Sequence, residues 1–272
     1  NRRHTASVAK DILLSGNNLF TEKPMAATYE QAKKLVNIAK AKKSTYFIGN
    51  MRLSDEGIQS AKKYYLNYLR NNKLGKIISF RSYCYAGGDY CNIEDEYIKT
   101  HEPTIRNIVQ PIAPKWVKKK NYYEFEKFLN YFVHDMGLIN FFFEEKPKIE
   151  NVYFNKRSGS VMLNYKKFYG TFEFAYLDNN AWDEGLEINF EKGKIKISLP
   201  PAFLRNQPAK IEITNYKKNS YKIVPNVNWT WSFKKQAENF ISLIKKKKFN
   251  ISSAESSLRD IQMVENIWKQ II

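Results

Sequence analysis

The feature that most constrains this chain is a short apolar run that stops at a charged pair and a proline, directly before an amphipathic segment. The run is Leu19-Phe20-Thr21, followed by Glu22-Lys23-Pro24. Residues 28–42 then place apolar side chains at helical spacing. The pattern predicts a strand, a tight turn and a helix. Ligands bind at the carboxyl ends of strands in open α/β sheets, so we expect Glu22 and Lys23 to lie at a binding site.

Pro24 restricts the backbone of this turn. Proline fixes its own φ and disfavours a helical backbone at the preceding residue, and an X-Pro bond in a tight turn is a candidate for the cis form. We therefore expect the Lys23 ammonium group to be held in one direction. The alternative is an exposed turn in which Glu22 and Lys23 form a surface salt bridge.

A second strand is predicted at 46–49, where Tyr46-Phe47-Ile48-Gly49 is apolar. Asn50 and Arg52 follow this strand, so they are expected at the same carboxyl edge as Lys23. For Arg52, a surface salt bridge is equally compatible with the sequence. A helix is predicted at 1–15, before the first strand.

The rest of the chain shifts from alternating strands and helices to a strand-rich region. Helices are predicted at 55–73 and 124–143, with a strand starting at residue 76 between them. Seven short strands follow, at 149–154, 161–165, 170–176, 186–190, 194–199, 211–215 and 221–224, and then helices at 232–247 and 253–271. Short alternating strands of this kind predict a largely antiparallel open sheet, with helices on one face and a partner on the other.

The helix predicted at 124–143 carries a polar pair on an otherwise apolar surface. Asn130 and His134 are four residues apart, so they share one helical face. Two interpretations are open for His134. It is either a buried, hydrogen-bonded structural residue or a general acid or base, because the ordinary histidine pKa lies near neutrality.

The formal net charge of +18 raises the question of nucleic-acid binding. The lysines are scattered, however, and the densest run, 245–248, closes a predicted helix, where cations suit the helix dipole. We therefore predict no nucleic-acid partner, although a nucleic-acid-binding protein is kept as a rival interpretation. No run of about 18 apolar residues is present, so we predict no membrane span.

The cysteine content argues against a disulfide framework. Cys84 and Cys91 are the two cysteines, and they lack metal-site partners at the usual spacing. We expect buried or free thiols in a reducing cytoplasm and no metal site. Residues 86–122 lack periodicity, and a loop of this length is either a substrate-side loop or a surface excursion.

Several of these features together resemble one family. They are Glu22-Lys23-Pro24 after a strand, His4 in the preceding helix, Leu74-Gly75-Lys76-Ile77 at a helix–strand junction, and His134-Asp135-Met136-Gly137-Leu138-Ile139. The pattern resembles the glucose–fructose oxidoreductase/inositol dehydrogenase/MocA family of NAD(P)-dependent sugar and cyclitol dehydrogenases. The resemblance implies an α/β fold class, with the C-terminal part of a Rossmann-type dinucleotide-binding domain at 1–52. It implies an α+β domain for substrate binding and oligomerisation at 53–272.

The resemblance also implies roles for individual residues. Lys23 would lie between nicotinamide and substrate and polarise the developing carbonyl, while His134 would take the hydroxyl proton. The hydride would pass to or from NAD or NADP. Asn130 stands where the family usually has an aspartate, so it can orient the imidazole but cannot share its charge. Residues implied at the cofactor edge are Glu22, Lys23, Pro24, His4, Asn50 and Arg52.

One family feature is missing. The chain has 11 glycines and no G-x-G-x-x-G spacing, which normally holds the pyrophosphate. By the resemblance, roughly 70 residues, about two βα units, would precede residue 1. We therefore expect the chain as given not to bind NAD normally, unless such a segment exists. This absence and Asn130 favour the alternative function, a catalytically inactive binding or scaffold protein.

The resemblance extends to one branch of the family. Phe128-Leu129-Asn130 with His134-Asp135 looks like enzymes of surface-polysaccharide sugar pathways. This implies a small-molecule partner, a nucleotide-linked or phosphorylated sugar. In the family, the free face of the sheet commonly forms an oligomer interface, so we also expect a cytoplasmic homo-oligomer.

Overall fold

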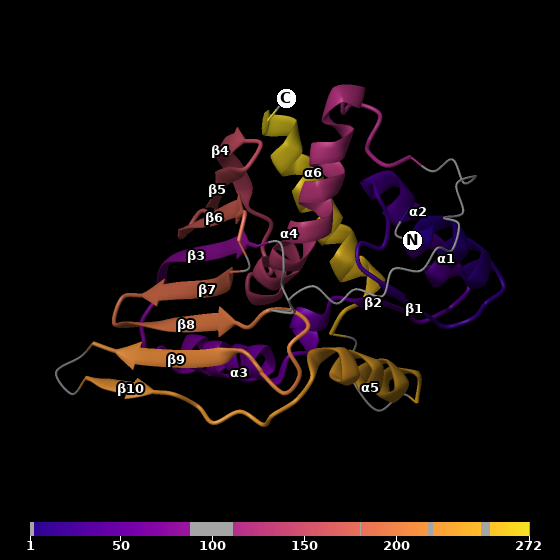
Figure 1. The fold of residues 1–272 in the computed structure, drawn as a ribbon. Coiled ribbons are helices and arrows are strands. Elements are labelled where there is room, and N and C mark those ends of the chain that lie inside the picture. The colour runs from indigo at the N-terminus through magenta and orange to yellow at the C-terminus, as the bar shows by residue number, and fades with distance from the viewer. Residues whose placement is uncertain (1–2, 88–110, 180, 217–219, 246–250, 272) are drawn as a thin grey trace.

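The strands of the chain form a small and a large sheet, with helices between and around them (Figure 1). The structure, a computed structural model, describes residues 3–87, 111–179, 181–216, 220–245 and 251–271. Most of the predicted substrate-side loop, including Cys91 and Pro103, lies outside these residues. None of the helices among the described residues is long and apolar enough to cross a membrane.

The N-terminal part follows the predicted strand–turn–helix pattern. Its elements are α1 (Thr5–Leu14), β1 (Leu19–Glu22), α2 (Tyr29–Ala41) and β2 (Tyr46–Gly49). Strands β1 and β2 are parallel, with Glu22 opposite Gly49. The Thr28 hydroxyl caps α2 by accepting a hydrogen bond from the Gln31 amide at 3.1 Å. The carboxyl ends of both strands therefore meet at one edge, as the sequence predicted.

A capped helix leads into the large sheet. Strand β2 is followed by η1 (Met51–Ser54), α3 (Glu56–Asn71) and β3 (Ile77–Ala86). The buried Asp55 carboxylate caps α3 by accepting from the Gly57 amide at 2.8 Å and the Ile58 amide at 3.2 Å. It also accepts from the Ala209 amide at 3.0 Å, which fixes the start of α3 against a segment that is distant in the sequence.

The large sheet has eight strands in the order β10-β9-β8-β7-β3-β6-β5-β4. Its remaining strands are β4 (Lys148–Asn155), β5 (Ser158–Asn164), β6 (Tyr169–Tyr176), β7 (Trp182–Phe190), β8 (Gly193–Leu199), β9 (Lys210–Asn215) and β10 (Tyr221–Ile223). Strand β3 pairs in parallel with β6, and the other pairs are antiparallel. The predicted α/β class with a largely antiparallel open sheet is confirmed.

Helices cover one face of this sheet (Figure 1). They are α3, α4 (Tyr122–Phe142, preceded by η2, Lys119–Asn121) and α6 (Ala254–Ile271), while α5 (Ser232–Ile244) lies beside η1. The aromatic stripe of α4 is buried, and Phe125 meets Trp268 of α6 edge-on at 5.4 Å between ring centroids. This packing explains the 3–4 spacing of the phenylalanines in α4.

Helix α6 contacts both sheets. It packs against β4 and β2, and the Ser252 hydroxyl just before it donates to the Ile48 carbonyl oxygen at 2.6 Å. The C-terminus of the chain therefore supports the strand edge that carries Lys23. The proposed boundary near residue 52 stays a prediction.

The opposite face of the sheet lacks a helical cover among the described residues. Tyr153, Met162 and Tyr169 are exposed there, and Arg81 forms a bidentate ion pair with Glu173. The strands alternate between buried and partly exposed positions, as expected for a sheet with one face in a core. The predicted oligomer interface on this face remains a prediction.

Candidate active site

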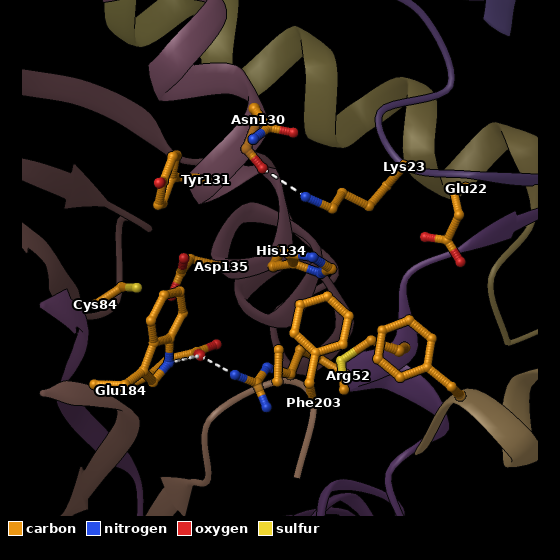
Figure 2. Close-up of a pocket in the computed structure, with 14 residues that line it drawn as sticks. Glu22, Lys23, Arg52, Cys84, Asn130, Tyr131, His134, Asp135, Glu184 and Phe203 are labelled. Carbon is orange, nitrogen blue, oxygen red and sulfur yellow. Dashed lines mark hydrogen bonds and ion pairs between the residues drawn. The ribbon is translucent and has the colours of Figure 1, made fainter. Parts of the chain in front are cut away.

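A cavity of about 470 Å³ opens where β1 and β2 end, between this edge, α4 and β7 (Figure 2). It is large enough for a small organic ligand. Five of the predicted site residues line it, namely Glu22, Lys23, Arg52, Asn130 and His134. Pro24, His4 and Asn50 are not among the lining residues, and Asn50 is buried behind His134.

Lys23 reaches across the cavity to helix α4. The Lys23–Pro24 peptide bond is cis, the form for which the sequence made it a candidate. The ammonium Nζ donates to the backbone carbonyl oxygen of Asn130 at 2.6 Å (Figure 2). The charge is therefore held on the same face of α4 that carries His134, four residues further along the helix.

The His134 imidazole is held by Asn50 at the end of β2. Its Nδ1 atom lies 2.9 Å from the amide oxygen Oδ1 of Asn50. Because a carbonyl oxygen can only accept, Nδ1 carries the hydrogen and the Nε2 lone pair is left for another partner. Burial, and then the positive charges of Lys23 and Arg52, lower the pKa of His134 well below its ordinary value. The ring is therefore neutral at pH 7, the state of a proton acceptor.

This geometry corrects one expectation from the sequence. We expected Asn130 to orient the imidazole, but Asn50 makes that contact, and Asn130 offers its backbone carbonyl to Lys23. Gly137, one turn after His134, leaves room for the Asn50 side chain to approach α4. A Cβ atom at Gly137 would lie 2.3 Å from Nδ2 of Asn50, so a side chain here would displace it. A glycine in the middle of a buried helix was the available signal for this close approach.

Arg52 forms a salt bridge, but a buried one. Its guanidinium pairs with the Glu184 carboxylate of β7 and donates to the Pro200 carbonyl oxygen at 2.8 Å. Both side chains are about 2–3% exposed. The indole Nε1 of Trp182 donates to the same Glu184 oxygen, Oε2, at 2.8 Å. From the sequence we considered a salt bridge at the surface for Arg52, whereas the observed salt bridge is buried. Arg52 forms part of the cavity wall.

From the sequence we did not identify Cys84, Trp182 and Glu184 as site residues, and we call these three the inner wall of the cavity. Glu184 is two residues beyond Trp182 on β7, so both project to one face of the strand. Glu184 also stands opposite Cys84 of β3 in the sheet register. An acidic residue at an inward strand position was the available signal. Burial raises the pKa of the Cys84 thiol well above its ordinary value, and nearby carboxylates raise it further.

Glu22 lies at the rim of the cavity. Its Oε1 accepts from the Gln236 side chain of α5 at 3.0 Å. Partial desolvation raises the pKa of this carboxyl group, while the hydrogen bond from Gln236 and the Lys23 charge act in the opposite direction. The surface salt bridge with Lys23, considered from the sequence, is replaced by these separate contacts to α5 and α4.

The first 50 residues are similar to a known family. Residues 1–50 match the glucose–fructose oxidoreductase/inositol dehydrogenase/MocA model, described as an oxidoreductase family with an NAD-binding Rossmann fold. The match covers 50 of the 272 residues. The resemblance drawn from the sequence is confirmed, and with it the relationship to NAD(P)-dependent oxidoreductases. No curated protein matches the chain significantly.

Solved structures extend the likeness to the whole chain. The 3-ketoreductase KijD10 from Actinomadura kijaniata, in complex with NADP and TDP-benzene, has a TM-score of 0.70 at 13% identity, covering 99% of this chain and 75% of its own. UDP-N-acetylglucosamine 3-dehydrogenase GnnA from Acidithiobacillus ferrooxidans has a TM-score of 0.67 at 12% identity, and the match covers 99% of this chain and 76% of GnnA. Aldose-aldose oxidoreductase from Caulobacter crescentus has a TM-score of 0.69 at 12% identity, and the match covers 99% of this chain and 74% of that enzyme. At these identities the comparison shows a shared fold.

Proposed function

We propose that the chain acts as an NAD(P)-dependent oxidoreductase that interconverts a sugar hydroxyl and its carbonyl. The observation that carries this proposal is the neutral His134, whose Nδ1 is held by Asn50 while the ring lines the same cavity as Lys23. A proton acceptor and a fixed cation at the carboxyl end of parallel strands suit alcohol oxidation.

The residues at the strand edge fit a nicotinamide cofactor. Glu22, Lys23, Pro24 and Arg52 lie at or beside the cavity, whereas Asn50 would act through His134. His4, at the start of α1, is assigned to the cofactor edge by the family resemblance alone. The bound nicotinamide would supply the hydride acceptor or donor. His134 would hold the hydroxyl proton at Nε2, and Lys23 would stabilise negative charge on the substrate oxygen.

A nucleotide-linked sugar is the substrate class that we favour. One relative of the same fold is a 3-ketoreductase bound to a TDP ligand, and another is a UDP-N-acetylglucosamine 3-dehydrogenase. Trp182, Phe203 and Phe233 are among the residues that line the cavity, and aromatic side chains provide apolar contacts for sugars and nucleobases. We place the reaction in surface-polysaccharide synthesis, in a cytoplasmic homo-oligomer formed through the open sheet face.

Cofactor binding is the first test. In a protein that includes a pyrophosphate-binding segment, calorimetry with NAD(H) and NADP(H) should detect binding, and a screen of nucleotide sugars should then detect reduction or oxidation of the cofactor. Lys23→Ala and His134→Ala should abolish turnover while leaving the fold intact. A wild-type protein that binds cofactor and sugar without turnover would instead support the catalytically inactive binding or scaffold protein, which Asn130 favours.

A further inference from the structure

The carboxyl group of Asp135 lies at the wall of the cavity without a hydrogen-bond partner among the residues that the structure describes. Asp135 follows His134 on α4, its side chain is fully buried, and it lines the cavity (Figure 2). Neither Oδ1 nor Oδ2 makes a hydrogen bond to another described residue. Burial of a polar group without hydrogen bonds is unfavourable, so such a group facing a ligand cavity points to a contact with the ligand.

The neighbouring charges determine the state of this carboxyl group. The Glu184 carboxylate forms an ion pair with Arg52 and accepts a hydrogen bond from Trp182. These contacts stabilise a negative charge on Glu184. Burial, and then the Glu184 charge, raise the pKa of Asp135 well above its ordinary value. The charges of Arg52 and Lys23 act in the opposite direction. The net shift favours the neutral carboxylic acid, which has a hydrogen to donate.

Titratable groups face Asp135 from four other parts of the structure as well as from α4. They are Cys84 of β3, Glu184 of β7, Arg52 of η1, Lys23 after β1, and His134 beside it on α4. The Arg52 guanidinium is engaged by Glu184 and by the Pro200 carbonyl. Among the described residues, Asp135 and the groups that face it are thus two acids, a thiol, the engaged Arg52 guanidinium, the Lys23 ammonium group and the His134 imidazole.

We propose that Asp135 is a substrate-binding residue that donates a hydrogen bond to a neutral hydroxyl or carbonyl oxygen of the sugar, and that this wall rejects an anionic sugar. The inference rests on the proposed function and narrows its substrate to an uncharged glycosyl group. A carboxylate on the ring would come close to the negative charge of Glu184, and this repulsion between like charges would weaken its binding. Phosphates of a linked nucleotide would lie away from Asp135.

The test uses two ligands that differ at one position. UDP-N-acetylglucosamine and its uronate, which carries a carboxylate in place of the primary alcohol, are titrated calorimetrically into the protein in the presence of NADPH. Wild type should bind the neutral sugar at least about 10-fold more tightly at pH 7. Its affinity for that sugar should fall as the pH is raised, because Asp135 then loses the hydrogen that it donates.

Two variants separate hydrogen bonding from charge. Asp135→Asn keeps a donor of the same shape, so it should bind the neutral sugar within about 3-fold of wild type, without the fall at high pH. Asp135→Leu removes the donor and should weaken binding roughly 10- to 100-fold. The control is Glu265→Gln, at a buried acid on α6 that does not line the cavity, and it should leave both affinities unchanged.

The outcomes distinguish this inference from the proposed function. Equal wild-type affinities for the two sugars would overturn the rejection of anions. Unchanged binding by Asp135→Leu, or a pH dependence that persists in Asp135→Asn, would overturn the role of Asp135 while leaving the dehydrogenase proposal intact. A protein that includes a pyrophosphate-binding segment and still binds neither sugar nor NADPH would contradict the proposed function itself, and the inference with it.

Discussion

The Nδ1 atom of His134 lies 2.9 Å from Oδ1 of Asn50, and this contact joins helix α4 to the end of strand β2. Asn50 is 3% exposed, so the hydrogen bond is shielded from water. It fixes the tautomer of the imidazole and directs Nε2 away from Asn50. The contact links the family-matched segment, residues 1–50, to the helix that completes the site.

Asn50→Ala should lower kcat/KM for the sugar by about 5- to 150-fold. Removing a buried hydrogen-bond partner costs roughly 1–3 kcal/mol, and the imidazole would no longer be held in one orientation. Steady-state kinetics would measure the loss. Asn37→Ala, at an exposed position of α2, is the matched control and should retain wild-type rates. Equal rates for both variants would remove Asn50 from the mechanism.

Lys23→Met should raise the pKa of His134. Burial makes the largest contribution to the low pKa and will remain, but the Lys23 charge also lowers it and will be gone. The imidazole resonance, assigned with His134→Gln, can be followed by NMR across the acid range. Lys10→Met removes an exposed charge on α1 and should leave the titration in place. This readout needs no catalytic activity, so it tests the geometry alone.

Asp260→Asn should become more stabilising as the pH rises from about 4 to about 7. Burial raises the pKa of Asp260 from 3.8 to about 7, against the hydrogen bond from Asn140 at 2.8 Å. Between these values the folded state holds a proton that the unfolded state has released. The contribution of Asp260 to unfolding free energy therefore falls with rising pH. The difference in unfolding free energy between variant and wild type should level off above pH 7, and a constant difference would contradict the assignment.

Arg52→Met should destabilise the fold by about 3–5 kcal/mol, because it leaves the Glu184 carboxylate buried without its cation. Arg81→Met is the control, since the Arg81–Glu173 pair is 41% and 32% exposed and should contribute less than about 1 kcal/mol. Urea unfolding would measure both. The double variant Arg52→Met/Glu184→Gln should recover part of the loss, whereas strict additivity would argue against a direct pair.

Gly137→Ala should cost roughly 1–3 kcal/mol, although alanine normally favours helices over glycine. The added Cβ would lie 2.3 Å from Nδ2 of Asn50 and would displace that side chain. The cost should shrink when Asn50 is already alanine, and a double-mutant cycle measured by thermal unfolding would detect this coupling. A stabilised Gly137→Ala single variant would show that Asn50 does not pack against α4.

The secondary structure of this chain could be predicted from local patterns. The helix around Leu35 and Val36, the aromatic helix around Phe128 and the seven later strands all formed near the predicted positions. Each depends on the spacing of apolar residues within one segment, which the backbone geometry translates directly into a buried face. The placement of Lys23 and Asn50 at one edge followed as well, because consecutive parallel strands share their carboxyl end.

The partners within the site depended on the tertiary structure. Arg52 and Glu184 are 132 residues apart, and they meet because η1, which follows β2, and strand β7, which lies beside β3, both border the cavity. The imidazole of His134 forms its hydrogen bond with Asn50 rather than with Asn130. This contact is possible because Gly137 has no side chain, so that Asn50, at the end of β2, can approach α4 closely. The sequence by itself determined the elements and the edge that bears Lys23. The three-dimensional packing decided which distant side chains meet there, because burial, charge and hydrogen bonding act between neighbours in space.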